Sequence, residues 1–267
     1  MITIDTSRAQ PLLLLPAFIN ERGPFALVLD TGAGTTVITE ELSSCIGLEA
    51  TEVREAMGAA GRKIAVSLGT AERISIGDSS LENVQVGIVK DFPRCAGQGA
   101  IGYNFLREFI LTIDYRGSTV QLASSTEKRV AEGGVRERVP LRIASPARPV
   151  LLVDVLINDR SSWRFFLDTG ASQTVISPAL AREIGIVTAR AGAITGAGGE
   201  VQGSVGQVRS LSVGKARRDS LPVVVSDIFS HLSQALGVQV EGILGYDFLS
   251  NFKVEIDYHE ETVSFER

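Results

Sequence analysis

The sequence predicts an all-β protein made of two homologous lobes, and three observations support this prediction. Hydrophobic residues make up 44% of the 267 residues and charged residues 21%, which is typical of a folded chain with a large core. The 27 glycines and 9 prolines are spread along the chain without a collagen-like period, as turns between short strands require. The second half of the chain also repeats the first. We therefore expect two similar β-rich units.

The duplication is clearest around an Asp-Thr-Gly tripeptide that occurs twice. The segment 25–34 (FALVLDTGAG) returns at 164–172 (RFFLDTGAS), so that Asp30 matches Asp168 at an offset of 138 residues. Such a long period indicates a duplicated structural unit. Further matches follow in the same order, at 36–39 with 174–177, 46–48 with 184–186, 58–61 with 196–199, 74–77 with 211–214, 101–106 with 244–249 and 113–115 with 256–258.

The duplication also sets the expected domain boundaries. We expect lobes over residues 1–123 and 150–267 and a linker over 124–149, which contains Gly133-Gly134 and three prolines. Each lobe carries 10 basic and 14 acidic side chains, whereas the linker carries 6 and 3. Two charge-matched halves therefore flank a basic connector.

Within each lobe, the pattern predicts strands with short helices. Strand-like runs at 12–18 and 151–157 are each followed by a polar turn and by a second strand that ends at the Asp-Thr-Gly. After the tripeptide come a β-branched strand and a helix, for which Thr39 and Ser177 are the expected N-caps. Alternating stretches then predict hairpins, at 65–76 with 84–89 and at 201–213 with 221–225.

Charge and hydropathy exclude several classes of function. The formal net charge is −5, and no basic run is interleaved with aromatic residues, so no nucleic-acid partner is expected. The apolar run 11–19 is too short to span a bilayer, and no membrane segment or signal peptide is visible. The compartment stays open between the cytoplasm and, if a signal has been trimmed, the periplasm or secretion.

Metal and cofactor chemistry have few residues to use. The sequence has two histidines and neither a CxxC nor an HExxH motif, so we expect no metal site and no cofactor. A GxGxxG spelling at 97–102 lacks the preceding strand of a dinucleotide site. The cysteines are expected to be ordinary thiols and the histidines surface residues, at Cys45, Cys95, His231 and His259.

The recurrence of Asp-Thr-Gly between an apolar strand and a Thr-Val-Ile strand is more than a chance turn. Together with the apolar-apolar-Gly elements at 100–102 and 243–245, it resembles the aspartic proteases of the retropepsin-like kind, in a form with two fused lobes. The resemblance covers nearly everything from residue 12 to residue 265. It implies the bilobal acid-protease fold, with two β-barrel-like lobes related by a pseudo-twofold axis.

This resemblance implies a catalytic dyad of Asp30 and Asp168 that shares one proton, because like charges so close cannot both ionise. The ionised member would activate a water, and the protonated member would polarise the scissile carbonyl. The two threonines would bond to the backbone of the opposite loop. Support of the two catalytic loops is expected from Thr31, Gly32, Ala33, Thr169, Gly170 and Ala171.

The resemblance further implies two glycine-tipped flaps that close over a substrate. Neither matched segment contains the flap tyrosine of pepsin-like relatives, so two flaps of the retropepsin type are expected. Plain glycine hairpins are the alternative interpretation. The expected flap and substrate-binding residues are Gly58, Ala59, Ala60, Gly61, Gly196, Ala197, Gly198 and Gly199.

Other matched residues are expected to serve the fold. Asp114 and Asp257 end matched strands, where solvated loop caps are the favoured interpretation, and Trp163 is expected to pack. Core support under the catalytic loops is expected from Tyr103, Phe105, Tyr246 and Phe248.

The sequence thus predicts a monomeric aspartic endopeptidase that acts on a peptide or protein substrate. Two alternatives stay open: an inert peptide-binding module, and a processing peptidase dedicated to one peptide or amide linkage. Ala33 and Ala171 stand where pepsin-like relatives carry Ser, whose hydroxyl can stabilise the charged carboxylate. The dyad is therefore expected to keep its shared proton to higher pH.

Overall fold

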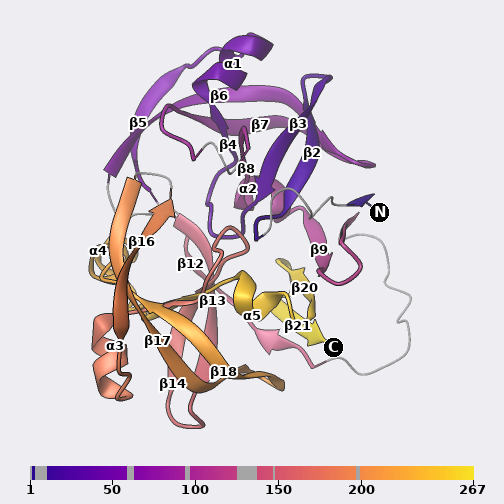
Figure 1. Cartoon of the computed structure of the whole chain (residues 1–267). Coiled ribbons are helices and arrows are strands. Elements are labelled where there is room, and N and C mark those ends of the chain that lie inside the picture. Colours follow the sequence, from indigo (N-terminus) through magenta and orange to yellow (C-terminus); the bar gives the residue numbers. More distant parts are fainter. Residues whose placement is uncertain are drawn as a thin grey trace.

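The described residues form three β-sheets, one in each half and a third that both halves share (Figure 1). In Figure 1 the first half is drawn from indigo to magenta and the second from salmon to yellow. The predicted all-β, two-lobe fold is confirmed. The computed structural model describes residues 2–3, 11–58, 63–93, 97–124, 137–146, 148–196 and 199–267.

A seven-stranded sheet builds the first half. The long strand β6 pairs with β5, β7 and also β2, which closes the sheet into a barrel-like shape. The helices are α1 (Glu40–Ile46), capped by Thr39 as predicted, and α2 (Tyr103–Leu106). In spatial order the strands are β2 (Leu14–Ile19), β3 (Arg22–Leu29), β8 (Gly99–Ile101), β4 (Val37–Thr39), β7 (Ser79–Val89), β6 (Lys63–Ile76) and β5 (Glu52–Met57).

The sheet of the second half repeats this order and adds one strand. Its helices are α3 (Pro178–Glu183), capped by Ser177 as predicted, α4 (Phe229–Leu236) and α5 (Tyr246–Leu249). In spatial order the strands are β12 (Arg142–Ser145), β13 (Arg148–Ile157), β14 (Ser162–Leu167), β19 (Gly242–Leu244), β15 (Val175–Ile176), β18 (Ala216–Val225), β17 (Gly199–Val213) and β16 (Ala189–Gly196).

A six-stranded sheet joins the two halves. Its central neighbours, β9 of the first half and β20 of the second, are antiparallel, and Ile113 lies opposite Val254. Both of these side chains are fully buried. In spatial order the strands are β1 (Ile2–Thr3), β10 (Thr119–Ser124), β9 (Phe109–Asp114), β20 (Lys253–Asp257), β21 (Thr262–Glu266) and β11 (Val139–Pro140).

Part of the expected linker 124–149 forms strands. β11 pairs with β21 in the shared sheet, and β12 pairs with β13 in the second half. The physical reason is a period-two pattern of apolar residues at Val139, Leu141 and Ile143, of which Leu141 is buried. Short apolar alternation is enough to add edge strands to existing sheets. Lobes over 1–123 and 150–267 remain our proposal for the division of the chain.

Matched aromatic residues fill equivalent places in the core. Phe105 packs on Phe109 with ring centroids 5.3 Å apart, and Phe248 packs on Phe252 at 5.2 Å. Both Phe105 and Phe248 are fully buried, which confirms their expected core role, and Trp163 packs at the edge of the same cluster. The four phenylalanine rings lie in or beside α2 and α5, the helices that follow the apolar-apolar-Gly elements.

Candidate functional site

The two Asp-Thr-Gly loops begin where matched strands end. β3 ends at Leu29 and β14 ends at Leu167, and each pairs in parallel with the strand that carries an apolar-apolar-Gly element. The Asp30 N–H donates to the Ile101 carbonyl at 3.1 Å, and the Asp168 N–H donates to the Leu244 carbonyl at 3.1 Å. These bonds hold each aspartate at the end of its strand.

Thr31 and Thr169 connect the two loops by reciprocal hydrogen bonds. The Thr31 hydroxyl donates to the Leu167 carbonyl at 2.8 Å and accepts from the Thr169 N–H at 3.0 Å. The Thr169 hydroxyl donates to the Leu29 carbonyl at 2.7 Å and accepts from the Thr31 N–H at 3.1 Å. Both threonines are buried, so these four bonds are shielded from water. The loops are therefore fixed relative to one another.

This arrangement brings the two aspartates together across the glycines. A Cβ atom added to Gly32 would lie 2.6 Å from Cγ of Asp168, and one added to Gly170 would lie 2.7 Å from Cγ of Asp30. Real Cβ atoms do not approach other atoms so closely. Each glycine thus leaves the space that the opposite carboxylate occupies.

Backbone N–H groups of the loops orient the carboxylates. Oδ1 of Asp30 accepts from the N–H groups of Gly32 at 2.9 Å and Ala33 at 3.0 Å. Oδ1 of Asp168 accepts from the N–H group of Gly170 at 2.8 Å. Donors of this kind favour the charged form of a carboxylate. At least one negative charge is therefore well accommodated.

The surroundings nevertheless favour a shared proton. Burial raises the pKa of Asp30 well above its ordinary value, and the neighbouring charge of Asp168 raises it further. Burial also raises the pKa of Asp168, while the backbone N–H groups of Gly170 and Ala171 offset part of that effect. The direct interaction between the two side chains raises the pKa of Asp30 and lowers that of Asp168. The pair can thus hold one proton at a pH where isolated carboxyls are ionised.

Further matched contacts support each Asp-Thr-Gly loop, and the sequence analysis did not identify them. In the first half, Asn104 Oδ1 accepts from the Thr36 N–H at 2.7 Å, and the Thr36 hydroxyl accepts from the Gly102 N–H at 3.1 Å. The Tyr103 N–H then donates to the Ala33 carbonyl at 2.8 Å. The loop that follows Asp30 is thereby tied to α2.

The second half uses a carboxylate where the first uses an amide. Asp247 Oδ1 accepts from the Thr174 hydroxyl at 2.6 Å and from its N–H at 2.9 Å, and the Thr174 hydroxyl accepts from the Gly245 N–H at 3.3 Å. The Tyr246 N–H donates to the Ala171 carbonyl at 2.8 Å. Burial raises the pKa of Asp247. The signal that could have found these residues is their place in both copies of the repeat.

The predicted flap segments lie at the ends of two hairpins. β5 pairs with β6 as far as Met57 opposite Lys63, and β16 pairs with β17 as far as Gly196 opposite Gly199. Gly58 follows β5 directly and is buried. Ala59, Ala60, Gly61, Ala197 and Gly198 lie outside the described residues. The role of all eight residues in substrate binding stays a prediction.

The two expected loop caps, Asp114 and Asp257, differ in their exposure to solvent. Asp114 accepts from the Gly117 N–H at 2.8 Å, as a turn cap does. Asp257 accepts from the N–H groups of His259 and Glu260, both at 3.1 Å, but it is buried rather than solvated. The expectation of a solvated cap is therefore wrong for Asp257. In the shared sheet Asp257 lies opposite Ile110, which is buried, whereas Asp114 lies opposite Lys253.

Several other expectations concern sites outside the dyad. Within the described residues, no group of three or more His, Cys, Asp or Glu side chains could hold a metal ion. No helix in the described part of the chain has the length and apolar character to cross a membrane. Cys45 is an exposed free thiol and His259 is exposed, whereas Cys95 lies outside the described residues.

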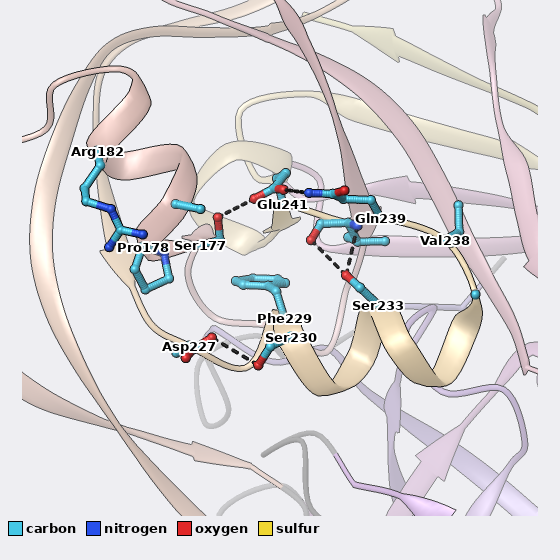
Figure 2. Close-up of a pocket in the computed structure, with 13 residues that line it drawn as sticks. Ser177, Pro178, Arg182, Asp227, Phe229, Ser230, Ser233, Val238, Gln239 and Glu241 are labelled. Atoms are coloured by element: carbon cyan, nitrogen blue, oxygen red, sulfur yellow. Dashed lines mark hydrogen bonds between the residues drawn. The ribbon is translucent and has the colours of Figure 1, made fainter.

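A pocket of about 500 Å³ lies between α3 and α4, and neither Asp30 nor Asp168 lines it (Figure 2). The Ser177 hydroxyl donates to Glu241, which also accepts from Gln239 at 2.6 Å. The helix α4 lies where the second copy is longer, and the described residues between β7 and β8 of the first half contain no helix. The lining residues are Ser177, Pro178, Ala179, Arg182, Asp227, Phe229, Ser230, Ser233, Gly237, Val238, Gln239, Val240 and Glu241.

Comparison with known proteins agrees with this geometry. A family model described as aspartyl protease matches residues 15–105 and again residues 153–248, which confirms the resemblance inferred from the duplicated motifs. The crystal structure of an aspartic proteinase from Irpex lacteus is similar, with a TM-score of 0.56 and 13% identity over 99% of this chain and 96% of that one. The likeness confirms the predicted bilobal acid-protease fold. No curated protein matches the sequence.

The threonine contacts generate a prediction about stability. Replacing Thr31 by Val leaves the Leu167 carbonyl and the Thr169 N–H buried without their partner. We expect a loss of about 2–4 kcal/mol in the free energy of unfolding, measured by urea denaturation. Thr51→Val is the control, because the Thr51 hydroxyl makes one partly exposed bond to Leu68. Equal effects of Thr31→Val and Thr51→Val would contradict the assigned role of the buried contacts.

Proposed function

The chain belongs to the aspartyl protease family, and from this premise we propose that it is an aspartic endopeptidase whose dyad is Asp30 and Asp168. The observation that carries the proposal is the close approach of the two carboxylates across Gly32 and Gly170. Two carboxylates that share one proton are the known means of activating a water against a peptide carbonyl. The raised pKa values of both aspartates favour this state.

The proposed reaction proceeds through one tetrahedral intermediate. The ionised carboxylate of the pair removes a proton from a water, and the resulting hydroxide adds to the scissile carbonyl carbon. The protonated carboxylate donates its proton to the carbonyl oxygen as negative charge develops there. The carboxyl that took the proton from the water then donates it to the amide nitrogen, and the carbon–nitrogen bond breaks. A hydroxyl of the intermediate gives its proton to the other carboxylate, and the products are a carboxylic acid and an amine. The dyad returns with one proton.

The remaining site residues serve this reaction in the proposal. Thr31 and Thr169 hold the carboxylates at their working distance, and Ala33 and Ala171 contribute backbone groups of the two loops. The hairpins that end at Gly58 and Gly196 would cover a bound peptide as flaps. Peptide binding would occur between the two lobes, because the dyad takes one carboxylate from each of them.

The first prediction concerns the dyad residues. Asp30→Asn and Asp168→Asn each keep the shape of the side chain but remove the state with two carboxylates and one proton. We expect each variant to lose about a thousand-fold or more in kcat, and the double variant little more, because the two groups act as a unit. The measurement is cleavage of a diverse peptide library by purified protein.

The control for this experiment is Asp114→Asn. Asp114 is also a strand-end aspartate, but its carboxylate accepts from Gly117 in a turn of its own. We expect this variant to cleave at the wild-type rate. Turnover near the wild-type rate by either Asp30→Asn or Asp168→Asn would end the dyad assignment.

The second prediction concerns pH. Activity requires one proton on the pair, so it fails when both carboxyls are protonated and when both are ionised. Because burial raises both pKa values and the charge of Asp168 raises that of Asp30 further, we expect a bell-shaped profile of kcat/KM centred at about pH 4–6.5. An activity that keeps increasing up to pH 8 would show that the doubly ionised pair is the active form, which contradicts the mechanism.

The third prediction concerns assembly. One chain supplies both aspartates, and the Thr31 and Thr169 bonds join them within that chain. We therefore propose a working monomer, and we expect specific activity to stay constant on dilution through the nanomolar range. The measurement is activity against concentration beside analytical sedimentation. A loss of activity that follows the dissociation of a dimer would place the site between two chains.

A further inference from the structure

The two Asp-Thr-Gly loops are supported by different chemical groups at one matched position. Asp247 in α5 lies two residues after Gly245, and Asn104 in α2 lies two residues after Gly102. The amide of Asn104 is neutral, whereas the carboxylate of Asp247 can carry a full negative charge. The two halves therefore differ in charge at a place that contacts the catalytic loops.

In the second half a continuous chain of hydrogen bonds leads from Asp247 to the backbone of Asp168. The Asp247 carboxylate accepts from the Thr174 hydroxyl at 2.6 Å, and that hydroxyl accepts from the Gly245 N–H at 3.3 Å. The peptide group that contains this N–H also contains the Leu244 carbonyl, which accepts from the Asp168 N–H at 3.1 Å. One hydroxyl and one peptide group thus join Asp247 to the catalytic loop.

The corresponding chain in the first half has no charge at its end. The Asp30 N–H donates to the Ile101 carbonyl at 3.1 Å. The N–H of the same peptide group, from Gly102, donates to the Thr36 hydroxyl at 3.1 Å. Asn104 then accepts from the Thr36 N–H at 2.7 Å. Because the peptide and hydroxyl groups are the same in both chains, the charge of Asp247 is what distinguishes them.

The contacts of Asp247 are those of an ionised carboxylate. It accepts from the N–H groups of Thr174 and Phe248, both at 2.9 Å, in addition to the Thr174 hydroxyl. Because the Thr174 hydroxyl already accepts from Gly245, its own proton is directed to the carboxylate. Burial raises the pKa of Asp247, and the bonds from Thr174 and Phe248 offset part of that effect. These donors therefore favour the charged form of Asp247.

We propose that Asp247 is a positioning residue of the dyad, and that its negative charge makes the dyad keep its shared proton to higher pH. In the chain described above, the hydroxyl and the peptide group both point their negative ends toward Asp168, and hydrogen bonds in such a chain polarise one another. A negative potential at Asp168 opposes the loss of the shared proton. This inference rests on the proposed function, because it assigns Asp247 to the reaction of Asp30 and Asp168.

The charged groups around Asp247 weaken this effect without removing it. Arg218 on β18 lowers the pKa of Asp247, but its Nη1 donates to Oδ1 of Asn251 at 2.6 Å and not to the carboxylate. The charge of Asp247 is therefore not paired directly. The other charged or titratable groups on β18, α5, β21 and the turn after β9 are Tyr115, Arg116, Arg217, Asp219, Tyr246 and Glu266.

The test exchanges the amide and the carboxylate between the halves. In Asp247→Asn the amide oxygen can accept from the Thr174 N–H, as Asn104 does from Thr36, but the charge is gone. The upper limb of the pH profile of kcat/KM, where the pair loses its shared proton, should move downward by about half a pH unit. Asn104→Asp adds a charge behind the Asp30 loop, so the same limb should move upward by about half a pH unit.

The matched control is Asp219→Asn, which also removes one negative charge. Asp219 lies on β18, a strand in contact with α5, but its side chain is exposed and bonds to Arg217 at 2.9 Å. No chain of hydrogen bonds from the Asp219 carboxylate to the dyad is present in the described part of the structure. We expect the pH profile of Asp219→Asn to superpose on the wild-type profile.

A second readout does not depend on cleavage. Carbon-13 NMR of the Asp30 and Asp168 carboxyl groups follows the loss of the shared proton in each folded variant. Relative to the wild type, we expect the midpoint of this loss at lower pH in Asp247→Asn and at higher pH in Asn104→Asp. A purely structural role of the two side chains would not shift the midpoint in opposite directions.

The outcomes separate this proposal from the proposed function. Opposite shifts of the two midpoints in a protein that cleaves no peptide would support the role of Asp247 and reject the protease function. Cleavage of peptides with unshifted midpoints, or with midpoints that move in the same direction, would overturn the role of Asp247 alone. If Asp247→Asn does not fold, the direction of the shift in Asn104→Asp decides. Failure of both variants to fold would overturn the proposal, because both side chains would then serve the fold.

Discussion

The reciprocal hydrogen bonds of Thr31 and Thr169 are the constraint on which the site depends. Each threonine bonds to the strand that ends at the other loop, so neither loop can move without breaking buried bonds of the other. Two like charges would otherwise separate, since their repulsion is large where water is excluded. The threonines hold the carboxylates together against that repulsion, and in the proposed mechanism a shared proton relieves it.

The glycines after the threonines complete this constraint. Any side chain at Gly32 or Gly170 would occupy the place of the opposite carboxylate. The tripeptide is therefore one physical unit: the Asp supplies the charge, the Thr holds the partner loop, and the Gly leaves room for the partner's charge. Because one chain contains the unit twice, the two halves need not be identical. Asn104 accepts a hydrogen bond from Thr36 in the first half, and Asp247 does the same from Thr174 in the second.

The duplication explains how much could be predicted from the sequence. Matched motifs identified both loops, the hairpins and the N-caps, because local spacing determines them. Strands β11 and β12 were not predicted, because they lie in a polar segment that contains prolines. Edge strands depend on an existing sheet more than on their own sequence. The burial of Asp257 and the pairing of Tyr115 with Tyr246 arise where β9 of the first half meets β20 of the second, which no local pattern reveals.

The central claim is that Asp30 and Asp168 share one proton, and carbon-13 NMR of the aspartate carboxyl groups tests it most directly. Comparison with Asp30→Asn and Asp168→Asn assigns the two signals. The account predicts that the pair takes up its two protons in separate steps, with a wide interval between them in which one proton is bound. Independent titration of both carboxyls near pH 4, the ordinary value, would contradict it.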